Sequence, residues 1–303
     1  MEEAGVEGEA VEVDVGGSIH GEPPFWIRNL PVLGVGLGFR KSLHKQILAN
    51  HKNIDFLEII ADHYFDLSFS QWLELRKLKR HFALIPHCLG LSVGSSESPD
   101  KLYIDNLISL LRMIKPPWWS DHIAMTRSGL LDIGHLAPVP FTDEYSRSIT
   151  QNILELKKAI AVPCIFENIA YTHSFANQLS ESQFIKEIID NSDSGLLLDL
   201  MNLYANSRNH DFDPYLFLDQ IPLARVVQIH IIGGHLANGL VIDSHSHITP
   251  LEVWELLRYV AQRTSIKAIL LEWDEYFPDF NVILNELTIA RSILNEYTAS
   301  QSG

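Results

Sequence analysis

The sequence predicts a single α/β domain folded as a TIM (β/α)8 barrel. From Gly34 onward, eight short apolar runs alternate with segments of helical period. Eight βα units over about 260 residues fit a closed barrel better than an open sheet, which has fewer strands and a topological switch point. Because no linker-like shift in composition divides this region, one barrel domain is expected at residues 29–298.

The apolar runs are expected to be parallel strands, because most of them lack the polar alternation of strands that are exposed on one face. They span residues 33–39, 55–60, 82–89, 118–125, 164–170, 195–202, 225–233 and 267–274. The intervening segments predict helices at residues 41–50, 69–81, 100–113, 143–160, 181–191, 214–220, 250–262 and 280–297. The carboxyl ends of all eight strands therefore meet at one face.

Charge and composition limit the partners and the location. The 303 residues include 23 Lys and Arg against 38 Asp and Glu, a net charge of −15. This charge opposes tight contact with nucleic acid or anionic lipid, so neither partner is expected. The acidic start of the chain is unlike a signal peptide, which favours the cytoplasm. Residues 1–28, rich in Gly and Glu, predict a disordered acidic leader.

Cys88 and Cys164 are the only cysteines, which is too few for a disulfide framework. Both lie within apolar runs, and we interpret them as small buried hydrophobic residues.

Polar side chains lie toward the carboxyl end of every apolar run after the first. In chain order they are Glu58, His87, Asp121 with His122, Glu167 with Asn168, Asp199 with Asn202, His230, and Glu272 with Asp274. Each alone has an ordinary structural explanation, such as a helix cap, a turn or a core histidine. A barrel brings all of them to the face where barrel enzymes carry their active sites.

Clustered carboxylates repel one another and are costly to desolvate without a positive charge between them. No Lys or Arg is recognised at these strand ends. Bound metal ions are therefore expected to supply the positive charge. Imidazole, carboxylate and carboxamide donors without thiolate suit iron, manganese or zinc.

The loop after the seventh run contains further candidate ligands. In "GGHLANGLVIDSHSHITP", Asp243, His245 and His247 alternate and can share one side of an extended segment. Asp243 and His245 are the better candidates, because Gly233 and Gly234 allow the loop to turn back over the barrel mouth. For His235 and His247, the sequence supports a role as metal ligands and a role without metal equally.

The ordered motifs resemble a known family, the multinuclear non-heme iron-dependent oxygenases, which includes the oxygenase of methanobactin biosynthesis. They are "GVGLGFR", "DFLEII", "PHCLGLSVGS", "SDHIA", "FENIAYT", "LLLDLMNLYAN", "QIHIIGG", "IDSHSH" and "LEWD". The resemblance runs from about Gly34 to Pro278. It implies a barrel of the xylose-isomerase-like type with two or three iron ions that activate dioxygen.

The resemblance also implies a substrate and a set of ligands. The substrate is a cysteine-containing precursor peptide, and a separate peptide-recognition protein often assists. The implied metal-site residues are Glu58 in support, His87, Asp121, Glu167, Asn168, Asp199, Asn202, His230, Asp243, His245 and Glu272. His122 and Asp274 are expected to orient the ligands.

The chain departs from the family pattern after "FLEII". The family shows a Pro-Glu-Asn-Tyr-like segment there, whereas this chain has "ADHYF", with Asp62 and His63 at the Glu and Asn positions. Both residues stay candidate ligands, and the number of metal ions stays open.

Two other functions are left open by the residues. A divalent-metal isomerase or phosphoesterase uses the same ligand types, with zinc or manganese in place of iron. A barrel that only docks a peptide or partner protein needs no catalytic metal.

Overall fold

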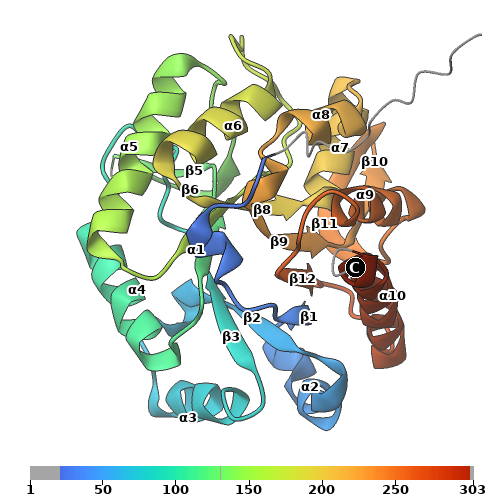
Figure 1. Ribbon diagram of the computed structural model, residues 1–303. Coiled ribbons are helices and arrows are strands. Elements are labelled where there is room, and N and C mark those ends of the chain that lie inside the picture. The colour runs from blue at the N-terminus through green and yellow to red at the C-terminus, as the bar shows by residue number, and fades with distance from the viewer. Residues whose placement is uncertain (1–20, 130, 301–303) are drawn as a thin grey trace, which may run out of the picture.

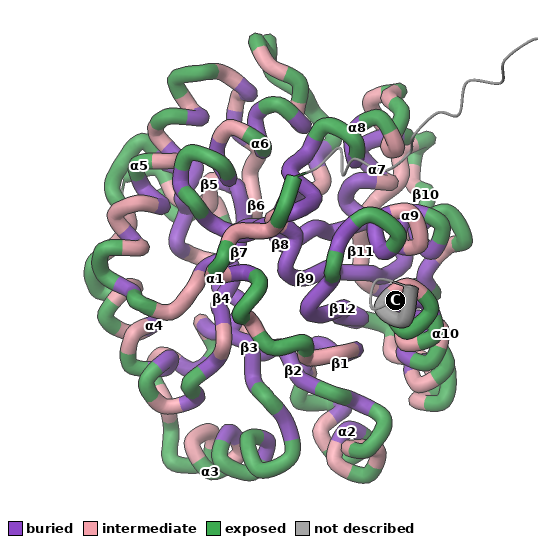
Figure 2. The backbone as a smooth tube through the Cα atoms, in the orientation of Figure 1, coloured by how far each residue is buried: buried purple, intermediate pink, exposed green. Residues whose placement is uncertain are grey.

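The computed structural model describes residues 21–129 and 131–300, and it confirms the predicted TIM barrel (Figure 1). Eight parallel strands close into one sheet in the order β1-β12-β9-β8-β7-β4-β3-β2. In Figure 2 the strands at the centre are buried, whereas exposed residues lie mainly on the surrounding helices and loops. The sheet is therefore the core that holds every strand end in place.

The elements agree with the predicted runs to within a few residues. The barrel strands are β1 (Gly34–Gly38), β2 (Phe56–Ile60), β3 (Ala83–His87), β4 (Trp119–His122), β7 (Cys164–Glu167), β8 (Gly195–Asp199), β9 (Val226–Ile231) and β12 (Ala268–Leu271). The predicted helices are α2 (His44–Ala49), α3 (Phe69–Leu78), α4 (Lys101–Ile114), α5 (Asp143–Ala159), α6 (Glu181–Ser192), α8 (Pro214–Gln220), α9 (Leu251–Ala261) and α10 (Phe280–Ser300). The 3₁₀ turn Lys41–Leu43 precedes α2.

Side-chain caps determine where many of the helices begin. Ser68 and Ser180 form complete capping boxes at the starts of α3 and α6. Asp100, Thr142 and Asp213 accept a hydrogen bond from a backbone N–H of α4, α5 and α8.

Two layers of side chains fill the inside of the barrel: an apolar layer toward the amino ends of the strands and a polar layer toward their carboxyl ends. The apolar layer contains Phe56, Ile85, Trp118, Ile165, Leu197, Val227, Ala268 and Leu270. Glu58, His87, Glu167, Asp199 and Glu272 come two residues after members of this layer. Because side chains alternate along a strand, these polar residues also face inward, at the carboxyl end.

A short helix closes the amino-terminal end of the barrel. Helix α1 (Phe25–Arg28) lies across the centre of the ring in Figure 1. Its Ile27 is 1% exposed and belongs to the apolar layer, and Trp26 packs against that layer. The expected leader, residues 1–28, thus extends too far, because residues 25–28 are part of the barrel structure. Residues 1–20 lie outside the described residues.

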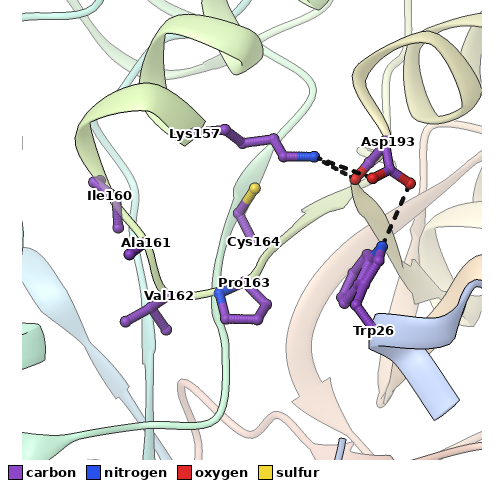
Figure 3. Close-up of a pocket in the computed structure, with 8 residues that line it drawn as sticks. All are labelled: Trp26, Lys157, Ile160, Ala161, Val162, Pro163, Cys164 and Asp193. Carbon is purple, nitrogen blue, oxygen red and sulfur yellow. Dashed lines mark hydrogen bonds and ion pairs between the residues drawn. The ribbon is translucent and has the colours of Figure 1, made fainter. Parts of the chain in front are cut away.

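The free cysteines are buried, as expected. Cys164 borders a cavity of about 240 Å³ beside α1, where Lys157 and Trp26 both contact Asp193 (Figure 3). Burial raises the pKa of the Cys164 thiol to about 12, so the thiol stays protonated at neutral pH. This cavity lies at the start of β7, away from the carboxyl ends of the strands.

Three features were not predicted from the sequence. Helix α7 (Leu200–His210) occupies a segment that the sequence predicts in part as strand, and Asp199 caps it. Hairpins follow β4 and β9: β5 (Met125–Ser128) pairs with β6 (Leu131–Ala137), and β10 (Gly233–Ala237) pairs with β11 (Leu240–His247). The dipeptide Asn238-Gly239, with φ of 52° and 82°, is a hairpin signal that would have identified the second one.

Within the described residues, no helix is long and apolar enough to cross a membrane.

We predict that Ile27→Ala lowers the free energy of unfolding by about 2–5 kcal/mol, because it leaves a cavity at the closed end of the barrel. Chemical denaturation measures the change. Phe25→Ala, on the same helix but 74% exposed, is the matched control and should change stability by less than about 0.5 kcal/mol. Equal losses in both variants would contradict the proposed role of α1.

Candidate metal centre

Three groups of histidine and carboxylate donors lie at the carboxyl ends of the strands, and two residues link them. The inner group is His87, His122 and Glu167; the central group is Glu167, Asp199, His230 and Glu272; the outer group is His245, Glu272 and Asp274. Within each group the donor atoms lie within 4.8 Å of one another. Glu167 and Glu272 belong to two groups each, so the three groups form one continuous cluster.

The register of the barrel creates this arrangement. His122 is the direct partner of Glu167 in the β4–β7 pair, and Asp199 is the partner of His230 in the β8–β9 pair. Residues far apart in the chain are therefore brought together by backbone pairing, before any ion binds.

The inner group has the spacing of metal ligands. His87 Nε2 lies 3.2 Å from His122 Nε2 and 3.6 Å from Glu167 Oε2, and His122 Nε2 lies 3.5 Å from the same oxygen. Ligands about 2.0–2.1 Å from a tetrahedral ion are separated by about 3.3–3.4 Å. Ser120 Oγ is 2.8 Å from His87 Nδ1 and orients the ring. The three donor atoms thus already surround a position suited to one ion.

The central group lies beside the inner one. Glu167 Oε1 is 3.6 Å from His230 Nδ1, while its Oε2 faces the inner group. Glu272 Oε2 is 3.0 Å from the same His230 nitrogen. Asp199 Oδ1 accepts a hydrogen bond from the N–H of Asn202 and leaves Oδ2 free. Because Glu167 directs one oxygen to each group, it is suited to bridging two ions.

The outer group depends on the β10–β11 hairpin. Asp243 Oδ2 is 2.8 Å from His245 Nε2, and His245 Nδ1 is 3.1 Å from Asp274 Oδ2. A Cβ on Gly233 would lie 2.0 Å from the carbonyl oxygen of Ile248, so only glycine permits this close return of the chain. The expected turn of the loop over the barrel mouth is therefore present.

Several buried donor atoms have no hydrogen-bond partner among the described residues. Those at the strand ends and on the β10–β11 hairpin are His122 Nδ1, Glu167 Oε2, Asp199 Oδ2, Asn202 Oδ1, His230 Nδ1, Asp243 Oδ1 and His245 Nε2, whereas His44 Nε2, Thr150 Oγ1, Thr249 Oγ1 and Glu286 Oε2 lie elsewhere. Buried polar atoms are normally satisfied, and the exceptions need an explanation such as an ion. The residues present thus fit bound metal ions.

Other expected ligands lie behind this cluster. Glu58 Oε2 is 3.2 Å from His230 Nε2 and accepts a hydrogen bond from Gln228, so it holds the ring from the far side. Asn168 uses both ends of its amide on the backbone of Asp199. Neither belongs to the three groups, whereas Asn202 keeps a free oxygen beside them.

The positions of Asp121 and His122 differ from the roles expected for them, in which Asp121 is a metal ligand and His122 orients the ligands. His122 belongs to the inner group, and Asp121 Oδ1 lies 3.4 Å from its Nδ1. Asp121 also accepts a hydrogen bond from the N–H of Leu91. Neighbouring residues on a strand face opposite sides, which places Asp121 outside the cluster in an orienting position.

The remaining candidates do not join the three groups. Asp62 accepts hydrogen bonds from the hydroxyl of Tyr103 and the N–H of Leu89. His63, His235 and His247 are exposed, and the last two contact serine hydroxyls on their own hairpin.

The expectation that no Arg or Lys reaches the strand ends was wrong. Arg40 follows β1, and its Nη2 lies 3.3 Å from Glu272 Oε1 and also contacts Asp274 Oδ1. The sequence contained a signal, since Arg40 ends the motif "GVGLGFR" directly after the first strand.

Neighbouring charges shift the pKa values of the histidines. Burial by itself lowers the pKa of His230, but Glu58, Glu167 and Glu272 together raise it well above its ordinary value. His245 is affected in the same way by Glu272 and Asp243. Burial raises the pKa of Asp199, and Asp243 adds to the effect. Protons on His230, His245 and Asp199 therefore offset part of the negative charge of the cluster.

This fold and site define a barrel of the metalloenzyme type, and sequence comparison gives the family. A sequence model of the RiPP precursor modification enzymes MbnB/TglH/ChrH matches residues 34–295. The chain belongs to this family.

One relative is similar to this chain in sequence, and two solved structures are similar to it in fold. A UPF0276 protein of Anaeromyxobacter sp. (strain Fw109-5) is 30% identical over 84% of this chain and 90% of its own length. Endonuclease IV from Thermus thermophilus has a similar fold, with a TM-score of 0.55, 12% identity, and coverage of 87% of this chain and 99% of that one. The IOLI protein, crystallised with a zinc atom, gives a TM-score of 0.54 and 13% identity, with coverage of 87% and 99%.

We predict that the metal-free protein loses stability as the pH rises above the ordinary histidine pKa of about 6.5. A raised pKa in the folded state means that protonation of His230 and His245 stabilises the fold fully below the ordinary histidine pKa, and this contribution is lost at higher pH. Thermal denaturation of chelator-treated protein measures the fall. Metal-loaded protein should show a smaller fall, because ions replace the protons. Identical pH profiles for the two forms would contradict a metal role.

We predict that His122→Ala weakens metal binding at the inner group, because one of its three donors is lost. Elemental analysis of purified protein measures the change. His235→Ala removes an exposed histidine and should retain the wild-type metal content. Equal metal content in the two variants would show that His122 is not a ligand.

Proposed function

We propose that this protein is an iron-dependent oxygenase that uses dioxygen to modify cysteine residues of a ribosomally made peptide. The observation that carries the proposal is the cluster of three donor groups joined through Glu167 and Glu272. A chain of linked sites is suited to several ions held close together. Membership of a family of precursor-peptide modification enzymes supports a peptide substrate.

The donor set supports iron, and manganese or zinc would fit the same ligand types. Histidine nitrogen and carboxylate oxygen, without thiolate, are typical ligands of non-heme iron. Cys88 and Cys164 are both outside the three groups. Bound iron would supply redox chemistry with dioxygen, and it would lower the pKa of a substrate thiol that binds to it.

The chain's own residues hold and orient the reacting groups. His87, His122 and Glu167 form a rigid, buried corner, because each extends from a barrel strand. Glu58 and Asp121 fix the rings of His230 and His122. This support limits ligand movement when a substrate approaches.

A cavity beside the cluster supports access for a peptide. It has a volume of about 450 Å³ and lies between β6, the segment 170–175 and β11. Asp243 lines it, and the same residue contacts His245 of the outer group. Leu136, Phe175 and Ile242 contribute apolar surface to its walls. A peptide side chain placed here would lie next to the metal groups, and a separate recognition protein would have only to deliver the peptide.

The first test is the metal content of anaerobically purified protein, followed by oxygen uptake with a cysteine-containing peptide. We expect two or three iron ions per chain and oxygen consumption that requires the peptide thiol. Glu167→Gln should weaken ion binding at least about tenfold, because Glu167 serves two groups. Asp62→Asn, outside the groups, is the matched control.

Other outcomes point to the alternative functions. Zinc or manganese alone, with no iron accepted on reconstitution, would favour a divalent-metal isomerase or phosphoesterase. The absence of any tightly bound metal would favour a barrel that only docks a peptide or partner.

A further inference from the structure

The two linking carboxylates of the metal groups have different surroundings. Both oxygens of Glu167 face candidate metal groups: Oε2 lies near His87 and His122, and Oε1 lies 3.6 Å from His230 Nδ1. Glu272 presents only Oε2 to the histidines, at 3.0 Å from His230 Nδ1 and 3.8 Å from His245 Nδ1. Its Oε1 lies 3.3 Å from Arg40 Nη2. Arg40 therefore holds one oxygen of Glu272, whereas neither oxygen of Glu167 pairs with a Lys or Arg among the described residues.

Asp274 shows the same division between its two oxygens. Oδ1 contacts Arg40 Nη2, while Oδ2 lies 3.1 Å from His245 Nδ1. Arg40 thus holds one oxygen of each carboxylate in the outer group. An ion that binds there must either share these carboxylates with a guanidinium or displace it.

The backbone of β1 provides the space for this arginine. Gly38 is paired with Glu58 in the barrel, so it lies at the level of the polar layer. A Cβ on Gly38 would lie only 3.3 Å from Arg40 Nη1, which is also anchored by a hydrogen bond to the carbonyl oxygen of Phe39. The Arg40 side chain is only 15% exposed. Arg40 is therefore a fixed cation of the barrel mouth, held in place by more than its two carboxylate partners.

We propose that Arg40 makes the outer group the weakest of the three metal positions, so that the chain holds its inner and central ions tightly and exchanges the outer one. This inference rests on the proposed metal centre. Two effects of Arg40 act in the same direction. It occupies carboxylate oxygens that an ion would use, and its positive charge repels a cation placed beside it.

The inner group is not under this restraint, and the central group meets it only at Glu272, whose Oε2 still faces His230 Nδ1. No Lys or Arg within the described residues forms an ion pair with Glu167 or Asp199. These groups are also fully buried, whereas His245 and Asp274 of the outer group are partly exposed. Ion binding at the outer group is therefore expected to respond to Arg40, and binding at the inner group is not.

The test is a titration of metal-free protein with Mn²⁺, in which the free ion is counted by its EPR signal. In the wild type we expect two tight ions and a third with a dissociation constant at least about tenfold higher. Arg40→Gln removes the charge and frees the carboxylate oxygens, and it should tighten the third ion about tenfold while leaving the first two unchanged. Arg40→Lys keeps the charge and should give a smaller gain, which provides a second measurement if the glutamine variant does not fold.

Arg225→Gln is the matched control. Arg225 has a similar exposure of 18% and also joins two carboxylates, Asp190 and Asp193, but it precedes β9 at the opposite end of the barrel. This variant should bind all ions as the wild type does.

Two other results of this titration would contradict the role of Arg40 or the metal centre itself. A third ion that is weakened or unchanged in Arg40→Gln, with the first two still bound, would overturn the role of Arg40 alone and show it to be a support for its carboxylates. Failure of the wild type to bind any ion tightly would overturn the proposed metal centre together with this inference.

Discussion

Repulsion between buried carboxylates is the constraint on which this structure depends. Glu58, Glu167, Asp199 and Glu272 converge inside one barrel mouth, with Asp243 and Asp274 at its edge. Such a set is stable only if positive charge lies among its members. His230, His245 and Arg40 supply part of that charge, and unpartnered donor atoms such as Glu167 Oε2 and Asp199 Oδ2 remain between them. In the proposed metal centre, bound ions would complete this balance.

The barrel separates stability from chemistry along each strand. The lower layer, sealed by Ile27 of α1, provides apolar packing, and the upper layer provides ligands two residues further on. A ligand can therefore be placed at a strand end with little change to the core below it. The β10–β11 hairpin contributes His245, and Asp243 of the same hairpin contacts it, so the outer group combines a hairpin residue with residues at the end of β12.

The sequence was sufficient to predict the barrel and most of the polar residues that gather at its carboxyl end, because both follow from local patterns. Apolar runs ending in Glu167, Asp199 or Glu272 indicate buried strands that carry an acid to one face. It was not sufficient to rank Asp121 against His122, because the two are adjacent and only the pairing of His122 with Glu167 decides which faces inward. Features that depend on three-dimensional packing were missed for the same reason. The position of Arg40 over the mouth follows from its contacts with Glu272 and Asp274, more than 200 residues away in the sequence.

The central claim is that ions occupy the spaces between these donors, and anomalous diffraction from anaerobically grown crystals tests it most directly. Data collected on both sides of the iron absorption edge locate iron and distinguish it from manganese and zinc. We expect iron peaks at the inner group (His87, His122 and Glu167) and at the central group (Glu167, Asp199, His230 and Glu272). Peaks elsewhere, or well-ordered crystals with no metal peak at either group, would contradict it.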